Sequence, residues 1–136
     1  MAEIEVPAAV AERLASAQLA WLTTVRADGQ PQSSYVWFHF DGTDLLICSL
    51  PTAGKVRNVR SSPLVSFHLD GDGSGGAVLT IDATAEITGE VSPERLTAYL
   101  AKYDEAIRTQ LNTTPEQVRA EYSATLRITP TRIRSW

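Results

Sequence analysis

The stretch Ser49–Pro63, SLPTAGKVRNVRSSP, joins an apolar strand pattern to a short cationic helix. The apolar run of residues 45–50 ends here, and Gly54 and Pro63 mark where the helix should begin and end. Free N–H groups and the helix dipole at such a start favour an anion, and Lys55 adds a full positive charge. The stretch therefore predicts a phosphate seat. It leaves open one alternative, a solvated basic helix that merely joins two strands.

Two hairpin signals precede this stretch. Ala20–Val25 is rich in β-branched and aromatic residues, and Asp28-Gly29 separates it from Pro31–Phe40 as a tight-turn signal. Asp41-Gly42 is a second turn of the same kind, and residues 44–50 form the next strand. We expect 31–40 to be one strand with an apolar face (Val36, Phe38 and Phe40) and a mixed face (Ser33, Tyr35, Trp37 and His39).

The rest of the chain alternates helices and strands. Helices are predicted over residues 7–18, over 92–103 with Ser92 as N-cap, and from 113 onward with either Thr113 or Thr114 as N-cap. Strands are predicted over residues 64–69, 77–90 and 124–136, and Pro130 should turn the middle of the last one into an edge or a bulge. About six strands with early hairpins exclude a repeating βαβ pattern and predict a mainly β, antiparallel barrel forming a single domain, residues 1–136.

Composition narrows the classes of partner. The 136 residues carry a formal net charge of −4, which argues against general nucleic-acid binding but permits a local basic pocket. Cys48 is the only cysteine of the sequence, so no intrachain disulfide is possible and a reducing cytoplasm is expected. No apolar run approaches the roughly 20 residues of a membrane span, and the acidic N-terminus lacks the basic start of a signal peptide. No membrane partner is therefore expected.

The sequence shows no catalytic constellation. His39 and His68 lie in predicted strands without Cys or Glu at ligand spacing, so no metal site is predicted. Cys48 lies in an apolar strand, which favours a buried, inert thiol over a nucleophile. The polar loop Asp70–Gly76 is superficially like a calcium loop, but Ile81 stands where the bidentate Glu would be. A cofactor that carries its own chemistry would explain a site without catalytic side chains.

Three ordered segments resemble a known family: LTTVRADGQP (Leu22–Pro31), YVWFHFDG (Tyr35–Gly42) and the region from Ser49 through KVRNV to Phe67. They are similar to the pyridoxamine 5′-phosphate oxidase-like flavin-binding split β-barrels. They resemble more closely the actinobacterial branch that uses the deazaflavin coenzyme F420. The similarity covers nearly the whole chain and is strongest from Leu22 to Phe67. It implies a split-barrel fold of the FMN-binding type and a homodimer with two cofactors at the subunit interface.

The resemblance also implies a phosphate site at the opening stretch. Lys55 and Ser49 would hold the cofactor phosphate, with Asn58 and Arg57 in support. Helical spacing places Lys55, Asn58 and Val59 on one side of the helix, while Arg57 points away.

The ring system of the cofactor would lie against strand two. The residues implied there are Gln32, Ser33, Val36 and Trp37. The polar loop 71–77 and the C-terminal strand, including Arg134 and Trp136, would approach from the other subunit.

The chain departs from the family pattern in two places. Ser33 and Phe38 stand where the pyridoxamine phosphate oxidases carry an Arg and a Lys that grip FMN, so vitamin B6 oxidation is not expected. Tyr35 stands where related sequences often carry Pro. We expect an F420-dependent oxidoreductase that passes hydride to a small unsaturated or conjugated acceptor. The alternatives are an FMN-dependent oxidoreductase of the same fold, or a non-catalytic protein that binds a flavin, a deazaflavin or haem.

Overall fold

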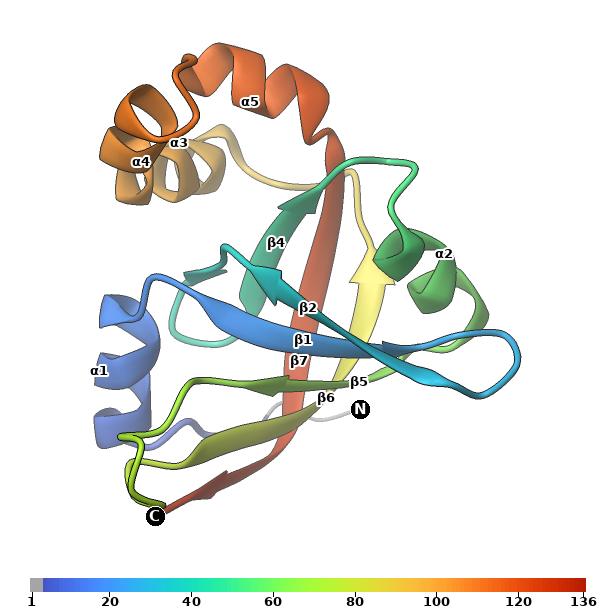
Figure 1. Ribbon diagram of the computed structural model, residues 1–136, viewed down its shortest axis with the longest axis vertical. Coiled ribbons are helices and arrows are strands. Elements are labelled where there is room, and N and C mark those ends of the chain that lie inside the picture. Colours follow the sequence, from blue (N-terminus) through green and yellow to red (C-terminus); the bar gives the residue numbers. More distant parts are fainter. Residues whose placement is uncertain (1–3) are drawn as a thin grey trace.

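The fold is a seven-stranded antiparallel sheet curled into a half-barrel, with short helices around it (Figure 1). It is seen in a computed structural model that describes residues 4–136. The strand order is β2-β1-β5-β6-β7-β4-β3. The strands are β1 (Ala20–Val25), β2 (Pro31–Val36), β3 (His39–Phe40), β4 (Leu45–Ser49), β5 (Leu64–His68), β6 (Leu79–Ile87) and β7 (Ala124–Ser135). The helices are α1 (Ala8–Ser16), α2 (Gly54–Ser61), α3 (Pro93–Lys102), α4 (Asp104–Thr109) and α5 (Pro115–Glu121).

The prediction of one strand over residues 31–40 is wrong. That segment forms two strands, β2 and β3, which lie at opposite edges of the sheet. The chain crosses from one edge to the other at Trp37 and Phe38. Here Tyr103, the C-cap residue of α3, provides the hydrogen-bond partner that a neighbouring strand would otherwise provide. The N–H of Phe38 donates to the hydroxyl of Tyr103 at 2.8 Å, and the ring of Trp37 stacks on the same tyrosine at 4.4 Å between centroids. A single short connection therefore links the two edges of the half-barrel.

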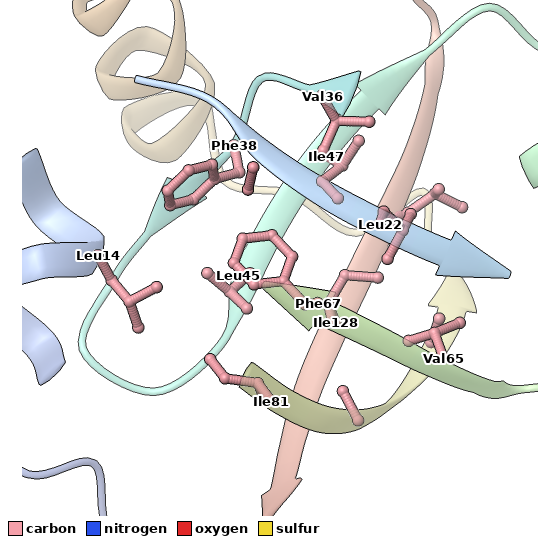
Figure 2. Close-up of a cluster of buried hydrophobic side chains, with 14 of the residues drawn as sticks. Leu14, Leu22, Val36, Phe38, Leu45, Ile47, Val65, Phe67, Ile81 and Ile128 are labelled. Carbon is pink, nitrogen blue, oxygen red and sulfur yellow. The ribbon is translucent and has the colours of Figure 1, made fainter. Parts of the chain in front are cut away.

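The core lies inside the curled sheet. Alternate positions of the strands point inward, as the period of two requires. Figure 2 shows these side chains converging from the strands, together with one from α1. The labelled members are Leu14, Leu22, Val36, Phe38, Leu45, Ile47, Val65, Phe67, Ile81 and Ile128. Val10 and Leu14 of α1 are both buried, so one face of that helix packs on the body of the fold.

The last strand carries the predicted irregularity at its proline. The register of β6 and β7 shifts between Asp82 and Ala83, where Pro130 and Arg132 are the partners. Thr131 is the extra residue, and its hydroxyl donates to the carbonyl of Asp82 at 3.0 Å. The shift is a β-bulge, which allows a proline, a residue without an N–H to donate, to lie within the strand.

Helices α3, α4 and α5 pack together beside β4 at the upper end of Figure 1. Their buried side chains form a second small core with Leu46, made of Tyr99, Tyr103, Ile107 and Val118. The predicted caps are confirmed: Ser92 and Thr114 each accept a hydrogen bond at 3.2 Å from the backbone N–H three residues on. Helix α4 was not predicted as a separate element. Within residues 4–136, no helix is long and apolar enough to cross a membrane.

Candidate cofactor-binding site

A cavity of about 330 Å³ lies where the ends of β2 and β4, the start of α2 and the helices α3 and α5 meet. Its wall is largely apolar and aromatic. The lining residues are Tyr35, Val36, Trp37, Cys48, Ser49, Leu50, Ala53, Lys55, Tyr99, Leu111, Val118 and Tyr122. This size and lining are typical of a small-molecule site.

Lys55 is the one charged residue in this wall, as far as residues 4–136 are concerned. It is half-buried, and burial lowers the pKa of its ammonium group. No carboxylate of the described chain lies within ion-pair distance of it. A partly desolvated cation without a partner favours an incoming anion.

The start of α2 adds to this preference for an anion. Its N-cap is Ala53, which has no side chain able to accept a hydrogen bond from the first N–H groups. The N–H of Val56 donates to the carbonyl of Ala53 at 3.1 Å, whereas those of Gly54 and Lys55 have no acceptor within residues 4–136. These two groups and the positive end of the helix dipole remain available to a ligand. Ser49 is also in the wall, 1% exposed, and its hydroxyl donates to the carbonyl of Leu50 at 3.0 Å.

The structure does not bring all the predicted phosphate ligands into one cavity. Arg57 and Asn58 line a separate, more open depression together with Gln32, Arg26, Ala27, Asp28 and Ser61. The amide of Asn58 donates to Thr24 Oγ1 at 2.9 Å and to Gln32 Oε1 at 3.1 Å. Asn58 and Val59 are buried, Lys55 is half-buried and Arg57 is exposed, as the helical spacing predicts, but Lys55 and Asn58 border different hollows. The buried face of α2 consists of Val56, Asn58 and Val59, and Lys55 lies at the edge of that face, toward β4.

Strand alternation also divides the residues predicted on strand two. Gln32 pairs in the sheet with Thr24, which is buried. Ser33 pairs with Thr23 and is exposed, and the hydroxyl oxygens of Ser33 and Thr23 lie 2.8 Å apart on the outer face. Val36 and Trp37, in contrast, both line the cavity with Lys55 and Ser49. Of the eight residues predicted from the resemblance, the cavity wall contains Val36, Trp37, Ser49 and Lys55, and the open depression contains Gln32, Arg57 and Asn58.

Sequence reasoning missed the helical side of the cavity. Tyr99 of α3, Val118 of α5, and Tyr122 at the C-cap of α5 close that side. The available signal was the spacing of four residues between Val118 and Tyr122, which places both on one face of a helix. That spacing alone could not identify a binding site, because nothing local distinguishes a cavity wall from a core.

The surroundings of Cys48 and of the two histidines indicate structural rather than catalytic roles. Burial raises the pKa of the Cys48 thiol, which agrees with the prediction of an inert group. His39 accepts a hydrogen bond from Arg95 Nε at 3.4 Å, and His68 stacks on Trp21 at 6.4 Å on the outer face of the sheet. Residues 4–136 contain no group of three or more His, Cys, Asp or Glu side chains placed to hold a metal.

The chain matches a known protein family. The sequence pattern of the family described as pyridoxamine 5′-phosphate oxidase matches residues 6–136. The chain belongs to this family. The predicted split-barrel fold is thereby confirmed for this oxidase-family protein.

Solved structures with the same fold differ in what they are described as doing. A conserved hypothetical protein from Mycobacterium tuberculosis is 27% identical, with a TM-score of 0.74, and the match covers 98% of this chain and 86% of that one. A protein described as an F420 reductase is 24% identical, with a TM-score of 0.71 and coverage of 95% and 98%. A haem storage protein from Vibrio cholerae is 18% identical, with a TM-score of 0.71 and coverage of 97% and 95%. The last two show the fold alone.

Proposed function

We propose that this oxidase-family protein is an F420-dependent oxidoreductase that transfers hydride between the deazaflavin and a small unsaturated or conjugated acceptor. The observation that carries the proposal is Lys55, a half-buried cation without a carboxylate partner at the edge of an aromatic cavity. The uncapped start of α2 beside it supplies N–H donors. Together they suit the phosphate of a cofactor.

The chain's own residues would bind and shield the cofactor. Lys55 and the first N–H groups of α2 would hold its phosphate, while Val36, Trp37 and Tyr99 would exclude water from its ring system. The deazaflavin itself supplies the hydride chemistry when bound. No side chain is assigned as a proton donor, so the proton would come from solvent.

FMN in the same fold is the nearest rival. Its phosphate could use Lys55 as well, but the family's strand-two cations are replaced by Ser33 and Phe38. Phe38 is fully buried in the core, and Ser33 faces away on the outer side of the sheet. Neither residue can supply the missing charge.

A haem-binding role is weaker still. Haem iron is normally held by an axial ligand such as His, Cys, Met or Tyr. Neither histidine lines the cavity, and the raised pKa values of the Cys48 thiol and of the Tyr35 and Tyr99 hydroxyls disfavour the anionic forms that would bind iron. Tyr122 is the other tyrosine of the wall. A non-catalytic flavin or deazaflavin carrier remains the main alternative to an enzyme.

The experiment that separates these roles is a pair of binding titrations with F420 and FMN on the same preparation. We expect F420 to bind more tightly. Reduced F420 with a panel of conjugated acceptors then distinguishes an enzyme from a carrier: turnover supports the oxidoreductase, and binding without turnover supports the carrier. Tighter binding of FMN, or purification with stoichiometric FMN, would overturn the assignment.

We further propose that the protein acts as a homodimer in a reducing cytoplasm. Large apolar side chains remain uncovered on the sheet, with Leu64 65% exposed on β5 and Trp136 70% exposed at the end of β7. A second copy of the chain would cover them.

A further inference from the structure

A row of three aromatic rings crosses the outer face of the sheet and ends at the cavity. His68 of β5, Trp21 of β1 and Tyr35 of β2 are direct partners in the strand register. Trp21 and His68 stack with centroids 6.4 Å apart and planes 19° apart, and Trp21 and Tyr35 stack at 4.6 Å and 29°. Because β2 is an edge strand, no further strand follows Tyr35 on that side.

Tyr35 is the member of this row that borders the cavity. Trp21 covers one side of its ring and is not part of the cavity wall, whereas Tyr35 is part of it. The tyrosine is 47% exposed, so a large part of its surface is not covered by protein. A flat ring entering the cavity could extend the row by one more stacked member.

Asp70 fixes two of these rings, Tyr35 and Trp21. Its Oδ2 accepts the hydroxyl of Tyr35 at 2.8 Å, and its Oδ1 accepts the indole N–H of Trp21 at 3.1 Å. One carboxylate thus holds both rings in their stacked positions. A fixed aromatic wall costs little entropy when a ligand binds against it.

We infer that Tyr35 is a specificity-determining residue, whose ring makes the cavity select flat, conjugated anions over saturated anions of the same size and charge. Trp21 and Asp70 are its positioning residues. The flat part of the ligand stacks on Tyr35, and its anionic group faces Lys55. The inference rests on the proposed function only in taking the cavity as the ligand site. It adds the selectivity that the cofactor cavity should show toward the ring system of its ligand.

Two matched probes test this selectivity without any cofactor. 2-Naphthoate is flat, and decahydro-2-naphthoate has the same skeleton and charge but is saturated. We expect the wild type to prefer 2-naphthoate in calorimetric titrations. Tyr35→Ala should weaken 2-naphthoate about 2- to 12-fold, the range of one aromatic pair, and change the saturated probe much less. Lys55→Ala should weaken both probes by the same factor.

The positioning of Tyr35 by Asp70 is tested by proton NMR spectra as well as by affinity. Stacking on Tyr35 should shift the bound naphthoate proton resonances upfield, and Tyr35→Leu should abolish that shift. Asp70→Ala should reduce the shift, and Asp70→Asn should restore it because the amide oxygen can accept the indole N–H of Trp21 while the amide NH2 donates to the tyrosine hydroxyl. Glu12→Gln, at an exposed position on α1 outside the cavity wall, is the control and should change neither reading.

The possible failures are distinct. If the wild type binds both probes equally, binds neither, or keeps its preference in Tyr35→Ala, the inference about Tyr35 is overturned whatever the cofactor titrations show. If the Tyr35-dependent preference is present but neither F420 nor FMN binds, the proposed function fails and the inference stands. The half-exposed position of Tyr35 makes the substitution compatible with folding.

Discussion

At the scale of the residue, Lys55 decides the proposed function. Lys55→Ala should weaken F420 binding about 10- to 150-fold, because a charge-assisted hydrogen bond worth roughly 1.5–3 kcal/mol is lost while the helix N–H groups remain. Added salt should weaken F420 binding to the wild type more than binding to the variant. Titrations at low and high salt measure both effects.

Arg57→Ala is the matched control for that experiment. Arg57 Nη1 donates to the carbonyl of Thr52 at 2.7 Å, and its side chain lines the other depression, so this substitution should affect F420 binding less. Equal or reversed effects of the two variants would place the phosphate in the depression lined by Arg57 and Asn58. The folding of Lys55→Ala should not suffer, because the wild-type cation is partly desolvated without compensation.

Asn58 has a structural role that can be measured independently. Its buried amide is the donor to both Thr24 Oγ1 and Gln32 Oε1. Asn58→Ala should lower the free energy of unfolding by about 1–3 kcal/mol, since the buried Thr24 hydroxyl loses this partner. Urea denaturation measures this change, with the exposed Arg60→Ala as a control expected to stay within about 0.5 kcal/mol. An unchanged midpoint for Asn58→Ala would show that water replaces the amide.

The residue scale also shows where sequence reasoning about the site succeeds and stops. Lys55 and Ser49 could be identified because a strand end, a turn and a cationic helix start are local features. Asn58 could not be separated from Lys55, because the orientation of α2 depends on the packing of Val56 and Val59 against the barrel. Tyr122 could not be predicted in the wall, because only the fold brings α5 beside β4.

At the scale of the element, the crossing between β2 and β3 depends on one tyrosine. Tyr103 accepts the Phe38 N–H at 2.8 Å and donates to the carbonyl of Gln18 at 2.7 Å. Tyr103→Phe should therefore destabilise the protein by about 1–3 kcal/mol, the cost of a buried N–H without a partner. Tyr122→Phe is the control, because its hydroxyl makes no hydrogen bond within residues 4–136. Equal denaturation midpoints for both variants would contradict this role.

Lys102 lies at the same crossing, and partial burial of its charged ammonium group costs folding free energy. Lys102 Nζ donates to the carbonyl of Phe38 at 2.9 Å and lies 4.0 Å from the centroid of the Phe38 ring. Burial lowers its pKa from 10.5 to about 8. Between about pH 8 and the onset of tyrosine ionisation near pH 10, the unfolded chain holds a proton that the folded protein has released. The contribution of Lys102 to stability should therefore rise with pH in this window, while the buried Cys48 thiol, which ionises more readily in the unfolded chain, acts in the opposite direction in both proteins compared below.

Lys102→Met should remove that rise. Denaturant melts of both proteins at pH 7.5, 8.5 and 9.5 measure it, and parallel stability curves would contradict it. Higher pH is unsuitable, because burial raises the pKa of Tyr99 and Tyr103, so ionisation of these tyrosines in the unfolded chain lowers stability there.

The elements were largely predictable because their signals are local. The bounds of β1 match the prediction, as do the caps of α3 and α5. The break within segment 31–40 was not predictable, because the alternation of apolar and mixed side chains continues unbroken through Trp37 and Phe38. What ends the strand is the hydroxyl of Tyr103, a residue 65 positions away from Phe38. No local pattern could signal that contact.

At the scale of the whole molecule, the proposed dimer can be tested by mass. Light scattering at micromolar concentration should report twice the 14.8 kDa of one chain. A double substitution of the exposed apolar residues, Leu64→Lys with Trp136→Lys, should shift the population toward monomer because charge resists burial. A monomeric wild type would contradict the proposal directly.

The position of β7 has a consequence for how the chain is made. The last strand of the sequence lies inside the sheet, between β6 and β4, and β4 has no neighbour other than β3 and β7. The pairs that β4 forms with Ala124–Ile128 are therefore impossible while those residues are still inside the ribosome. The nascent chain must wait with β4 unpaired on one side, an exposed template for strand pairing. Completion of the barrel is thus an event that waits until Ala124–Ile128 have left the ribosome.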